Sequence, residues 1–275
     1  MTVSTHHRRR REIGPRHIRH TKEKKMDTTT KVAVITGGGS GIGQSVAQRF
    51  SRGGWTVVLA GRRMERLNET KKLLNGKPCL CVATDVTVEE DVERLFETVE
   101  ETFGKVDLLF NNAGVNSPPA SVEDVKYEDF EKVMKVNVLG PFLCAKVAMK
   151  LMGKHGGGRI INNGSISSQV PRPHSVAYAV SKHAVTGLTK SIALDGRKLN
   201  VACGQVDFGN VVSELSLKMH SEEGAMQPNG TRMKEPVISM DIAVEAVWNM
   251  ASLPLEANVL QMSLMASGMP FVGRG

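Results

Sequence analysis

The chain has 275 residues, of which 40% are hydrophobic and 23% charged, so it is long enough to bury the core of one α/β domain. It contains no run of about eighteen apolar residues and no apolar signal-peptide core, which argues against a membrane span and against secretion. We therefore expect a cytoplasmic protein with no membrane partner. The four cysteines lie in apolar surroundings without metal-ligand spacing, so we expect reduced, buried thiols and no metal site; they are Cys79, Cys81, Cys144 and Cys203.

The formal charge of +8 is concentrated at the N-terminus. Residues 1–25 hold nine Lys or Arg and two Glu, and the rest of the chain carries a net charge of +1. A basic arm that binds polyanions and a segment for organellar import are both open interpretations. Because no apolar face accompanies the charges, we favour a disordered extension over residues 1–30, or an upstream start that precedes Met26. The charge therefore does not indicate a nucleic-acid partner.

From Lys31 onward, short apolar runs alternate with helix-length amphipathic segments. Strands are predicted at residues 31–36, 55–61, 78–84, 106–112, 158–163, 199–206 and 258–264. Helices are predicted at residues 41–53, 63–75, 89–103, 124–152, 176–196 and 241–252. This alternation predicts a single-domain, doubly wound α/β fold of Rossmann type over residues 31–275, with a parallel seven-stranded sheet and helices on both faces. Ligands bind such sheets beyond the carboxyl ends of the strands.

A glycine-rich turn, TGGGSGIG at residues 36–43, follows the first strand and opens a helix. Gly37, Gly41 and Gly43 lack Cβ atoms, which permits a tight turn and a close approach of the backbone to a pyrophosphate. Ser40 and Ile42 belong to the same turn. Its position between a strand and a helix predicts a dinucleotide-binding site.

Three motifs together resemble the short-chain dehydrogenase/reductase family: TGGGSGIG at 36–43, NNAG at 111–114 and YAVSK at 178–182. They occur in the family's order, and the resemblance covers residues 31 to about 265. It implies an oxidoreductase that transfers a hydride between a nicotinamide cofactor and a carbonyl or alcohol substrate. It also implies a homo-oligomer, a dimer or tetramer, and residues 142–152 and 184–194 carry more apolar positions than one sheet face is expected to cover.

The YAVSK motif places Tyr178 and Lys182 four residues apart on a predicted helix, where they share a face. A cation beside a phenol stabilises the phenolate, so such a tyrosine can exchange a proton with an alcohol or carbonyl oxygen. The resemblance implies this acid/base role, with Lys182 also binding the nicotinamide ribose. It further implies that Ser165 binds the substrate oxygen and that Asn137 maintains a water-mediated proton relay behind Lys182.

Other polar residues lie near the tyrosine. Ser167 and Ser168 are alternatives to Ser165, but the thirteen-residue offset from the tyrosine favours Ser165. His174 and His183 flank the motif, and we expect loop or surface positions for them without a role in proton transfer.

The end of the second strand indicates which cofactor is preferred. Gly61 stands where a carboxylate would bind the adenosine ribose and exclude a 2′-phosphate, and Arg62 follows it. A guanidinium can pair with that phosphate, which favours NADP, while Ser40 in place of a basic residue removes a second phosphate contact and leaves NAD possible. By resemblance, the adenine and ribose are lined by Asp85, Val86, Asn112, Ala113 and Gly114.

The sequence departs from the family after the sixth strand, where Val206 and Asp207 stand in place of the common Pro-Gly pair. We expect backbone groups of Val206 to contact the cofactor carboxamide. Asp207 is expected to cap a turn, with contact to a polar substrate as the alternative. The polar, glycine-punctuated residues 211–236 are predicted to form a substrate lid.

These observations predict an NADP-dependent carbonyl reductase or alcohol dehydrogenase acting on a small molecule. An NAD-linked polyol or sugar dehydrogenase is the alternative enzyme. A non-catalytic nucleotide-sensing or scaffold protein is the alternative of another class. An enzyme is favoured because a non-catalytic pocket has no need of Tyr178 and Lys182 together.

Overall fold

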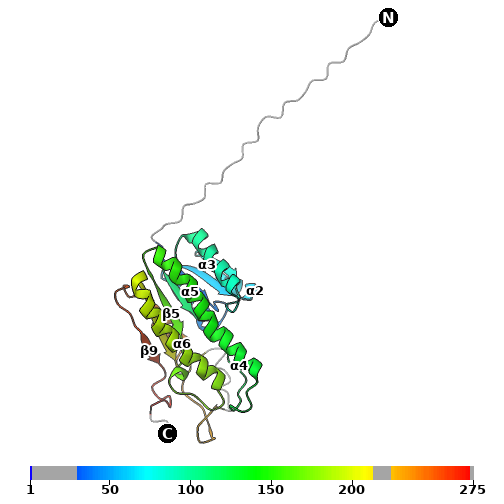
Figure 1. Ribbon diagram of the computed structural model, residues 1–275, viewed down its shortest axis with the longest axis vertical. Helices are drawn as coiled ribbons and strands as arrows, with labels where there is room; N and C mark the ends of the chain where they lie inside the picture. The colour runs from blue at the N-terminus through cyan, green and yellow to red at the C-terminus, as the bar shows by residue number, and fades with distance from the viewer. Residues whose placement is uncertain (2–29, 213–223, 273–275) are drawn as a thin grey trace.

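The computed structural model describes residues 1, 30–212 and 224–272. Nearly all of the predicted N-terminal extension and residues 213–223 of the predicted lid lie outside the described residues. Seven strands form one parallel sheet in the order β3-β2-β1-β4-β5-β6-β9 (Figure 1). The strands are β1 Val32–Thr36, β2 Thr56–Gly61, β3 Cys79–Ala83, β4 Leu108–Asn111, β5 Gly158–Asn163, β6 Val201–Phe208 and β9 Gln261–Leu264. The predicted doubly wound fold is confirmed.

Helices cover both faces of the sheet. In Figure 1, α3, α5 and α6 lie across the near face of the sheet. Helices α1 and α8 pack together over the other hydrophobic core, on the opposite face. The helices are α1 Gly41–Arg52, α2 Met64–Lys72, α3 Glu89–Phe103, α4 Tyr127–Met134, α5 Gly140–Lys154, α6 Val176–Asp195 and α8 Met240–Ser252.

The two hydrophobic cores follow from the alternation of side chains along each strand. Ala33 and Ile35 of β1 join the core beneath α1 and α8, whereas Val32 and Val34 join the core beneath α3 and α5. All five residues of β1 are buried. This double burial explains why the central strands read as continuous apolar runs rather than as alternating ones.

The helix predicted at residues 124–152 is interrupted. A π-helical segment, Lys135–Leu139, joins α4 to α5, and this segment holds Asn137. By length and composition the stretch from Tyr127 to Lys154 is apolar enough to cross a membrane, but half of its most apolar window is buried. Residues such as Cys144 and Met152 pack into the core beneath the helix, so a core helix accounts for this composition.

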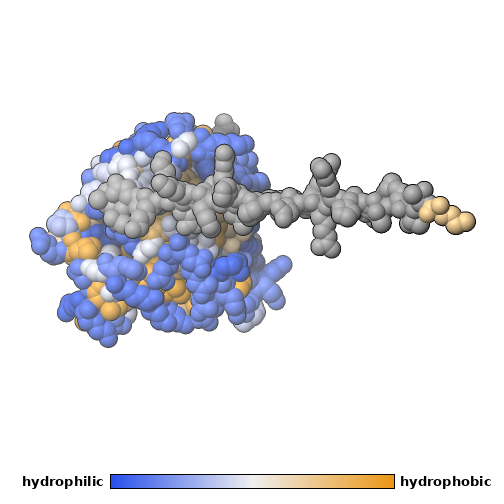
Figure 2. All heavy atoms as spheres, turned by 90° about the horizontal axis from the view of Figure 1, so that it is seen from above, coloured by the Kyte–Doolittle hydropathy of each residue, from blue (hydrophilic) through white to orange (hydrophobic). Residues whose placement is uncertain are grey.

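The predicted lid contains a short hairpin that the sequence pattern did not indicate. Strand β7, Ala225–Met226, pairs antiparallel with β8, Arg232–Met233. Where Figure 2 colours the surface, hydrophilic residues predominate and hydrophobic ones form small, separate patches.

All four cysteines are free thiols. Cys144 and Cys203 are buried as expected, but Cys79 and Cys81 lie on the edge strand β3 and are partly exposed, so the expectation of full burial is wrong for this pair. Burial raises the pKa of the Cys144 thiol to about 12. Among the described residues, no group of three or more His, Cys, Asp and Glu is arranged to hold a metal ion.

Candidate active site

The predicted motifs gather at one edge of the sheet. Strands β1, β4, β5 and β6 are neighbours and run parallel, so the loops that follow them leave the sheet at the same edge. The glycine turn follows β1, the NNAG motif ends β4, and Ser165 follows β5. This is the edge at which doubly wound sheets bind ligands.

The glycine turn brings the N-terminus of α1 close to β4. Gly37 and Gly41 have positive φ angles of 65° and 52°, which residues other than glycine rarely adopt. A Cβ atom on Gly43 would collide with the Asn112 side chain and with the Gly37 carbonyl. Ser40, exposed, precedes the helix, and its first turn carries no acidic residue. The first N–H groups of α1 are therefore suited to an anion such as a pyrophosphate.

The NNAG motif is fixed by hydrogen bonds to both neighbouring strands. The Thr36 hydroxyl accepts hydrogen bonds from the backbone N–H groups of Asn112 and Ala113, at 2.9 and 3.1 Å. Asn112 Oδ1 accepts a hydrogen bond of 2.9 Å from Asn163 Nδ2, and Gly114 is exposed. Sequence reasoning did not select Thr36 and Asn163. The sequence pattern could have identified them, because both are polar residues at the carboxyl ends of apolar strands, where doubly wound sheets bind ligands.

Tyr178 and Lys182 lie side by side on α6, as their spacing predicted. The Lys182 Nζ atom is 5.4 Å from the centre of the Tyr178 ring and donates a hydrogen bond of 2.7 Å to the Asn163 carbonyl. Lys182 is buried and Tyr178 is half-buried. A buried ammonium group is thus held between a phenol ring and the end of β5, which can support proton exchange at the phenol oxygen.

Asn137 connects the segment after NNAG to α6. Its Oδ1 accepts the Val115 N–H at 2.8 Å, while its Nδ2 donates to the Val115 carbonyl and to the Ser181 hydroxyl at 2.9 and 3.1 Å. The side chain is buried within the π-helical segment. Asn137 therefore contacts α6 at Ser181, the residue next to Lys182, and the water-mediated relay stays a prediction.

Ser165 lies at the start of a 3₁₀ turn, η2 Ile166–Ser168, which packs against α6. Its Oγ accepts a hydrogen bond of 3.1 Å from the Ser167 N–H, and its own N–H donates to Asp207 Oδ1 at 2.9 Å. Because the Ser165 oxygen already accepts a hydrogen bond, its proton is available for donation to a substrate oxygen. Ser167 and Ser168 lie inside the turn, which supports Ser165 as the candidate.

The family model described as short chain dehydrogenase matches residues 31–224. The chain belongs to the short-chain dehydrogenase/reductase family. It is 39% identical over 203 residues to an uncharacterized oxidoreductase of Thermotoga maritima, covering 72% of this chain and 80% of that protein. It is 32% identical over 227 residues to glucose 1-dehydrogenase 2 of Bacillus subtilis, covering 81% and 88%. It is also 32% identical over 196 residues to the NAD-dependent glycerol dehydrogenase of Listeria innocua, covering 71% and 76%.

Solved structures of the same family are similar throughout the fold. An alcohol dehydrogenase from Thermococcus sibiricus, complexed with 5-hydroxy-NADP, superposes with a TM-score of 0.75 at 25% identity, covering 87% of this chain and 98% of that one. A 3-ketoacyl-(acyl-carrier-protein) reductase from Brucella melitensis, complexed with NADH, gives 0.76 at 28% identity, covering 86% and 97%. The protein is thus an NAD(P)-dependent short-chain dehydrogenase/reductase.

This short-chain dehydrogenase/reductase departs from the expected arrangement at the end of β6. Asp207 lies inside the strand and is completely buried, so the expectation that it caps a turn is wrong. Strand β6 continues to Phe208, two residues beyond the predicted end. The Val206 side chain is buried in the core and its carbonyl accepts the Gly164 N–H at 2.8 Å. A main-chain contact from Val206 to the cofactor stays a prediction.

The adenosine end of the predicted cofactor site lies after β2 and β3. Gly61 ends β2, and Arg62 is exposed and forms no ion pair with any described residue. Asp85 accepts hydrogen bonds from the backbone and hydroxyl of Thr87, which fixes the loop after β3. Val86 is buried.

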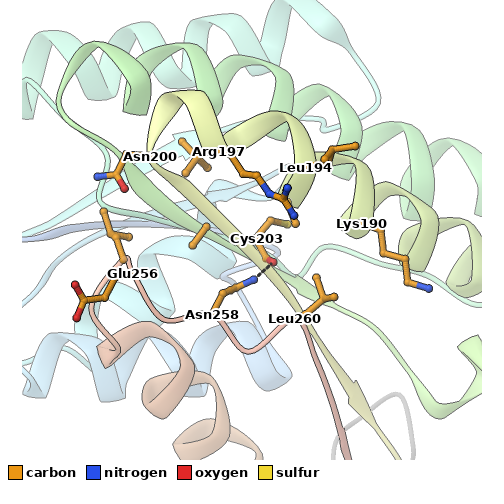
Figure 3. A pocket seen from close by; sticks show the side chains of 12 residues that line it. Lys190, Leu194, Arg197, Asn200, Cys203, Glu256, Asn258 and Leu260 are labelled. Atoms are coloured by element: carbon orange, nitrogen blue, oxygen red, sulfur yellow. Dashed lines mark hydrogen bonds between the residues drawn. The ribbon is translucent and has the colours of Figure 1, made fainter.

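Two cavities border α6, and neither is lined by Tyr178 or Lys182. One, of about 760 Å³, lies against the helix face that carries Val176, Ala179, Val180 and His183, opposite the Tyr178 face. The other, of about 470 Å³, is shown in Figure 3; there Asn258 donates a hydrogen bond to the Cys203 carbonyl. This second cavity is lined by the first residues of β6, so it lies away from the carboxyl ends of the strands, where the sheet is expected to bind ligands.

Proposed function

We propose that this protein is an NADP-preferring carbonyl reductase or alcohol dehydrogenase in which Tyr178 is the general acid/base. One observation carries the proposal: the buried Lys182 ammonium, held by the Asn163 carbonyl, lies against the Tyr178 ring. In the reductive direction Tyr178 gives its proton to the substrate oxygen, and in the oxidative direction it takes that proton back. Ser165 donates a hydrogen bond to the same oxygen, and the bound nicotinamide supplies or accepts the hydride.

The residues at the glycine turn fit a dinucleotide. A Cβ atom at Gly41 would meet nothing within 4 Å, and the N-terminus of α1 begins at this residue. The backbone there is open to a ligand, and the positive end of the helix favours the pyrophosphate. In the same turn Gly37 and Gly43 pack closely against Asn112 and Ala113 in the loop after β4, and these residues would hold the cofactor beside the turn.

NADP is proposed over NAD because no carboxylate stands at Gly61 and Arg62 has no ion-pair partner among the described residues. The alternative, an NAD-linked polyol or sugar dehydrogenase, is supported by the likeness to glucose 1-dehydrogenase 2 and to the NAD-dependent glycerol dehydrogenase. A non-catalytic nucleotide-sensing role has no support from the site, because the paired Tyr178 and Lys182 serve proton transfer.

The test is a screen of carbonyl compounds with NADPH and NADH, and of alcohols and polyols with NADP and NAD. We expect the reduced cofactor to be consumed with carbonyl compounds and formed with alcohols, as measured by its absorbance. The kcat/KM should be higher with NADPH and NADP than with NADH and NAD. Turnover of polyols with NAD and not with NADP would favour the alternative enzyme. Tight cofactor binding without turnover of any compound class would contradict catalysis.

We also propose that the protein self-associates through the outer faces of α5 and α6. Most apolar side chains of residues 142–152 are buried within this protein. Fewer of them are therefore left exposed for contact with another copy than the sequence analysis predicted. Large apolar side chains remain exposed on both helices, Phe142 on α5 and Val180 and Leu194 on α6, and Leu139 is exposed in the π-helical segment that precedes α5.

A further inference from the structure

Asp207 is a buried carboxylate inside β6 whose hydrogen-bond partners in the described part of the chain are all uncharged. Its Oδ1 accepts the Ser165 N–H at 2.9 Å and Gln205 Nε2 at 2.6 Å. Its Oδ2 accepts Gln261 Nε2 at 2.7 Å and Gln169 Nε2 at 3.3 Å. A carboxylate offers about four acceptor sites, and these four donors fill them. The carboxylate of Asp207 is completely buried, and each of its acceptor sites is therefore satisfied by a hydrogen bond from the protein.

The chain after β5 is shaped to admit this side chain. A Cβ atom on Gly164 would collide with Asp207 Oδ1 and would lie 2.8 Å from Gln205 Cγ. The absence of a side chain at Gly164 lets the carboxylate lie directly against the backbone that leads into Ser165. Gly164 directly follows β5 and Asp207 lies in the neighbouring strand β6, so the missing glycine side chain leaves the space that the carboxylate occupies.

The glutamine that approaches Asp207 from its own strand is itself fixed. Gln205 Nε2 also donates to the Thr186 hydroxyl at 2.9 Å, and Gln205 Oε1 accepts the Thr189 hydroxyl at 3.0 Å. Both threonines lie on α6, the helix that carries Tyr178 and Lys182. The network therefore joins the backbone at Ser165 to the helix that holds the other candidate catalytic groups.

We propose that Asp207 is a positioning residue that holds the Ser165 backbone and so directs the Ser165 hydroxyl toward the substrate oxygen; this rests on the proposed function. The Ser165 N–H is bound by Asp207, and its Oγ is held from the other side by the Ser167 N–H. Two anchors on one residue restrict its rotation, and the hydroxyl proton is left to donate. Holding a hydrogen-bond donor in its productive geometry before substrate binds lowers the barrier to reaction.

The contact itself is tested in the full chain by amide hydrogen exchange, followed by mass spectrometry of peptides that span residues 158–169. In Asp207→Ala we expect exchange at this segment to rise about tenfold or more, and to rise less in Asp207→Asn, which keeps one acceptor oxygen for the Ser165 N–H but places an NH2 group among the glutamine donors. Asp107→Ala is the matched control, because Asp107 also accepts a backbone N–H, that of Val32 at 2.7 Å, at the opposite edge of the sheet. If Asp207→Ala fails to fold, Asp207→Ser, whose shorter side chain cannot span the same partners, takes its place.

The positioning role is tested by a double-mutant cycle with Ser165→Ala. We expect Asp207→Ala to lower kcat about tenfold to a hundredfold in the unmodified background and less than about threefold in the Ser165→Ala background. Dissociation of NADPH, measured by its own fluorescence, should change by less than about threefold in every variant. Asp207→Asn, which keeps one acceptor oxygen, should retain more of kcat than Asp207→Leu, which fills the same space without an acceptor; equal kcat in these two variants would indicate a merely space-filling role.

The exchange experiment and the double-mutant cycle distinguish failure of the proposed function from failure of the positioning role. Absence of turnover by the unmodified protein overturns the proposed function. Unchanged exchange at residues 158–169 in Asp207→Ala overturns the contact in solution. Equal losses of kcat in the two backgrounds show that Asp207 does not act through Ser165, and they overturn the positioning role.

Discussion

Lys182 illustrates how this site is built from single residues. A buried ammonium group is costly unless hydrogen bonds and neighbouring groups compensate for the lost water. Here the Asn163 carbonyl accepts a hydrogen bond of 2.7 Å, and the Tyr178 ring lies 5.4 Å away, within range of a cation–π contact. The Lys182 ammonium group is thereby placed beside the phenol without a substrate, which is the arrangement that the proposed proton transfer requires.

Arg62 carries the prediction on cofactor preference. The double variant Gly61→Asp, Arg62→Leu is expected to reverse the preference from NADP to NAD. Loss of a charge-assisted contact to the 2′-phosphate costs about 1.5–3 kcal/mol, or about tenfold to a hundredfold in affinity, and the new carboxylate adds repulsion. The aspartate should fit, because the nearest atom to a Cβ on Gly61 is Leu67 Cδ2 at 3.4 Å.

The measurement is the ratio of kcat/KM for the two cofactors with one substrate, at fixed salt because exposed ion pairs are screened. Arg197→Leu is the control, since Arg197 is equally exposed but borders the cavity at the start of β6. A preference for NAD in the unmodified protein would show that Arg62 does not bind the phosphate, without affecting the role of Tyr178.

At the scale of elements, the predicted lid is fastened to the loop before α6. Glu235, which follows β8, is completely buried and forms an ion pair with Arg172. It also accepts hydrogen bonds from Asn210 and Gln227 at 2.9 and 3.0 Å. Burial alone would raise the pKa of Glu235, but the hydrogen bonds from Arg172 and Gln227 outweigh it and hold that pKa below its ordinary value. The hairpin β7–β8 is thus tied to the segment that leads into Tyr178.

This lowered pKa predicts how stability depends on pH. The folded state favours the deprotonated form of Glu235. Its contribution to the free energy of unfolding is therefore fully present above the ordinary glutamate pKa of about 4.3 and is lost as pH falls through the lower pKa of the folded state. We expect Glu235→Gln to lower Tm at pH 7, with a difference from the unmodified protein that shrinks toward pH 4 and below. Glu69→Gln, which breaks an exposed pair with Arg66, should change Tm little at either pH. A constant difference across this range would contradict the assignment.

Elements differ in how far the sequence predicts them. Strand β5 and helix α3 have their predicted bounds, because apolar periodicity and turn residues are local signals. The π-helical segment around Asn137 was not predicted, and the contacts that Asn137 makes there, with Val115 and Ser181, are to residues 22 and 44 positions away in the sequence. The site of Asp207 was missed for the same reason. Its partner Ser165 is 42 residues away and Gln261 is 54 residues away, and no local pattern reports such contacts.

At the scale of the whole molecule, the candidate site forms because parallel strands deliver distant segments to one edge. The pairing of β4 with β5 and of β5 with β6 aligns Asn111 with Asn162 and Asn163 with Val206. The alternation of strands and helices was enough to predict this edge, whereas the candidate residues along it came from the glycine-rich, NNAG and YAVSK motifs and from the family resemblance. The partners of each side chain were not predictable, because they are set by packing between elements.

The exposed apolar residues of α5 and α6 predict self-association. Phe142 and Val180 are 45% and 41% exposed, and their helices are neighbours (Figure 1). Burying such side chains between copies is favourable by about 25 cal/mol per Å² of apolar surface. We expect a dimer or tetramer at micromolar concentration by light scattering, and a smaller mass for the double variant Phe142→Glu, Val180→Glu. Leu73→Glu, on α2's C-terminal side and 48% exposed, is the control. A monomeric mass for the unmodified protein would contradict this prediction.

The central claim, that Tyr178 transfers the proton in a hydride-transfer reaction, is tested most directly by Tyr178→Phe. The substitution keeps the ring that packs against Lys182 and removes the hydroxyl. The account predicts that kcat falls about a hundredfold to ten-thousandfold while the dissociation constant of NADPH stays within a few-fold of the unmodified value. Undiminished kcat in this variant would contradict the account.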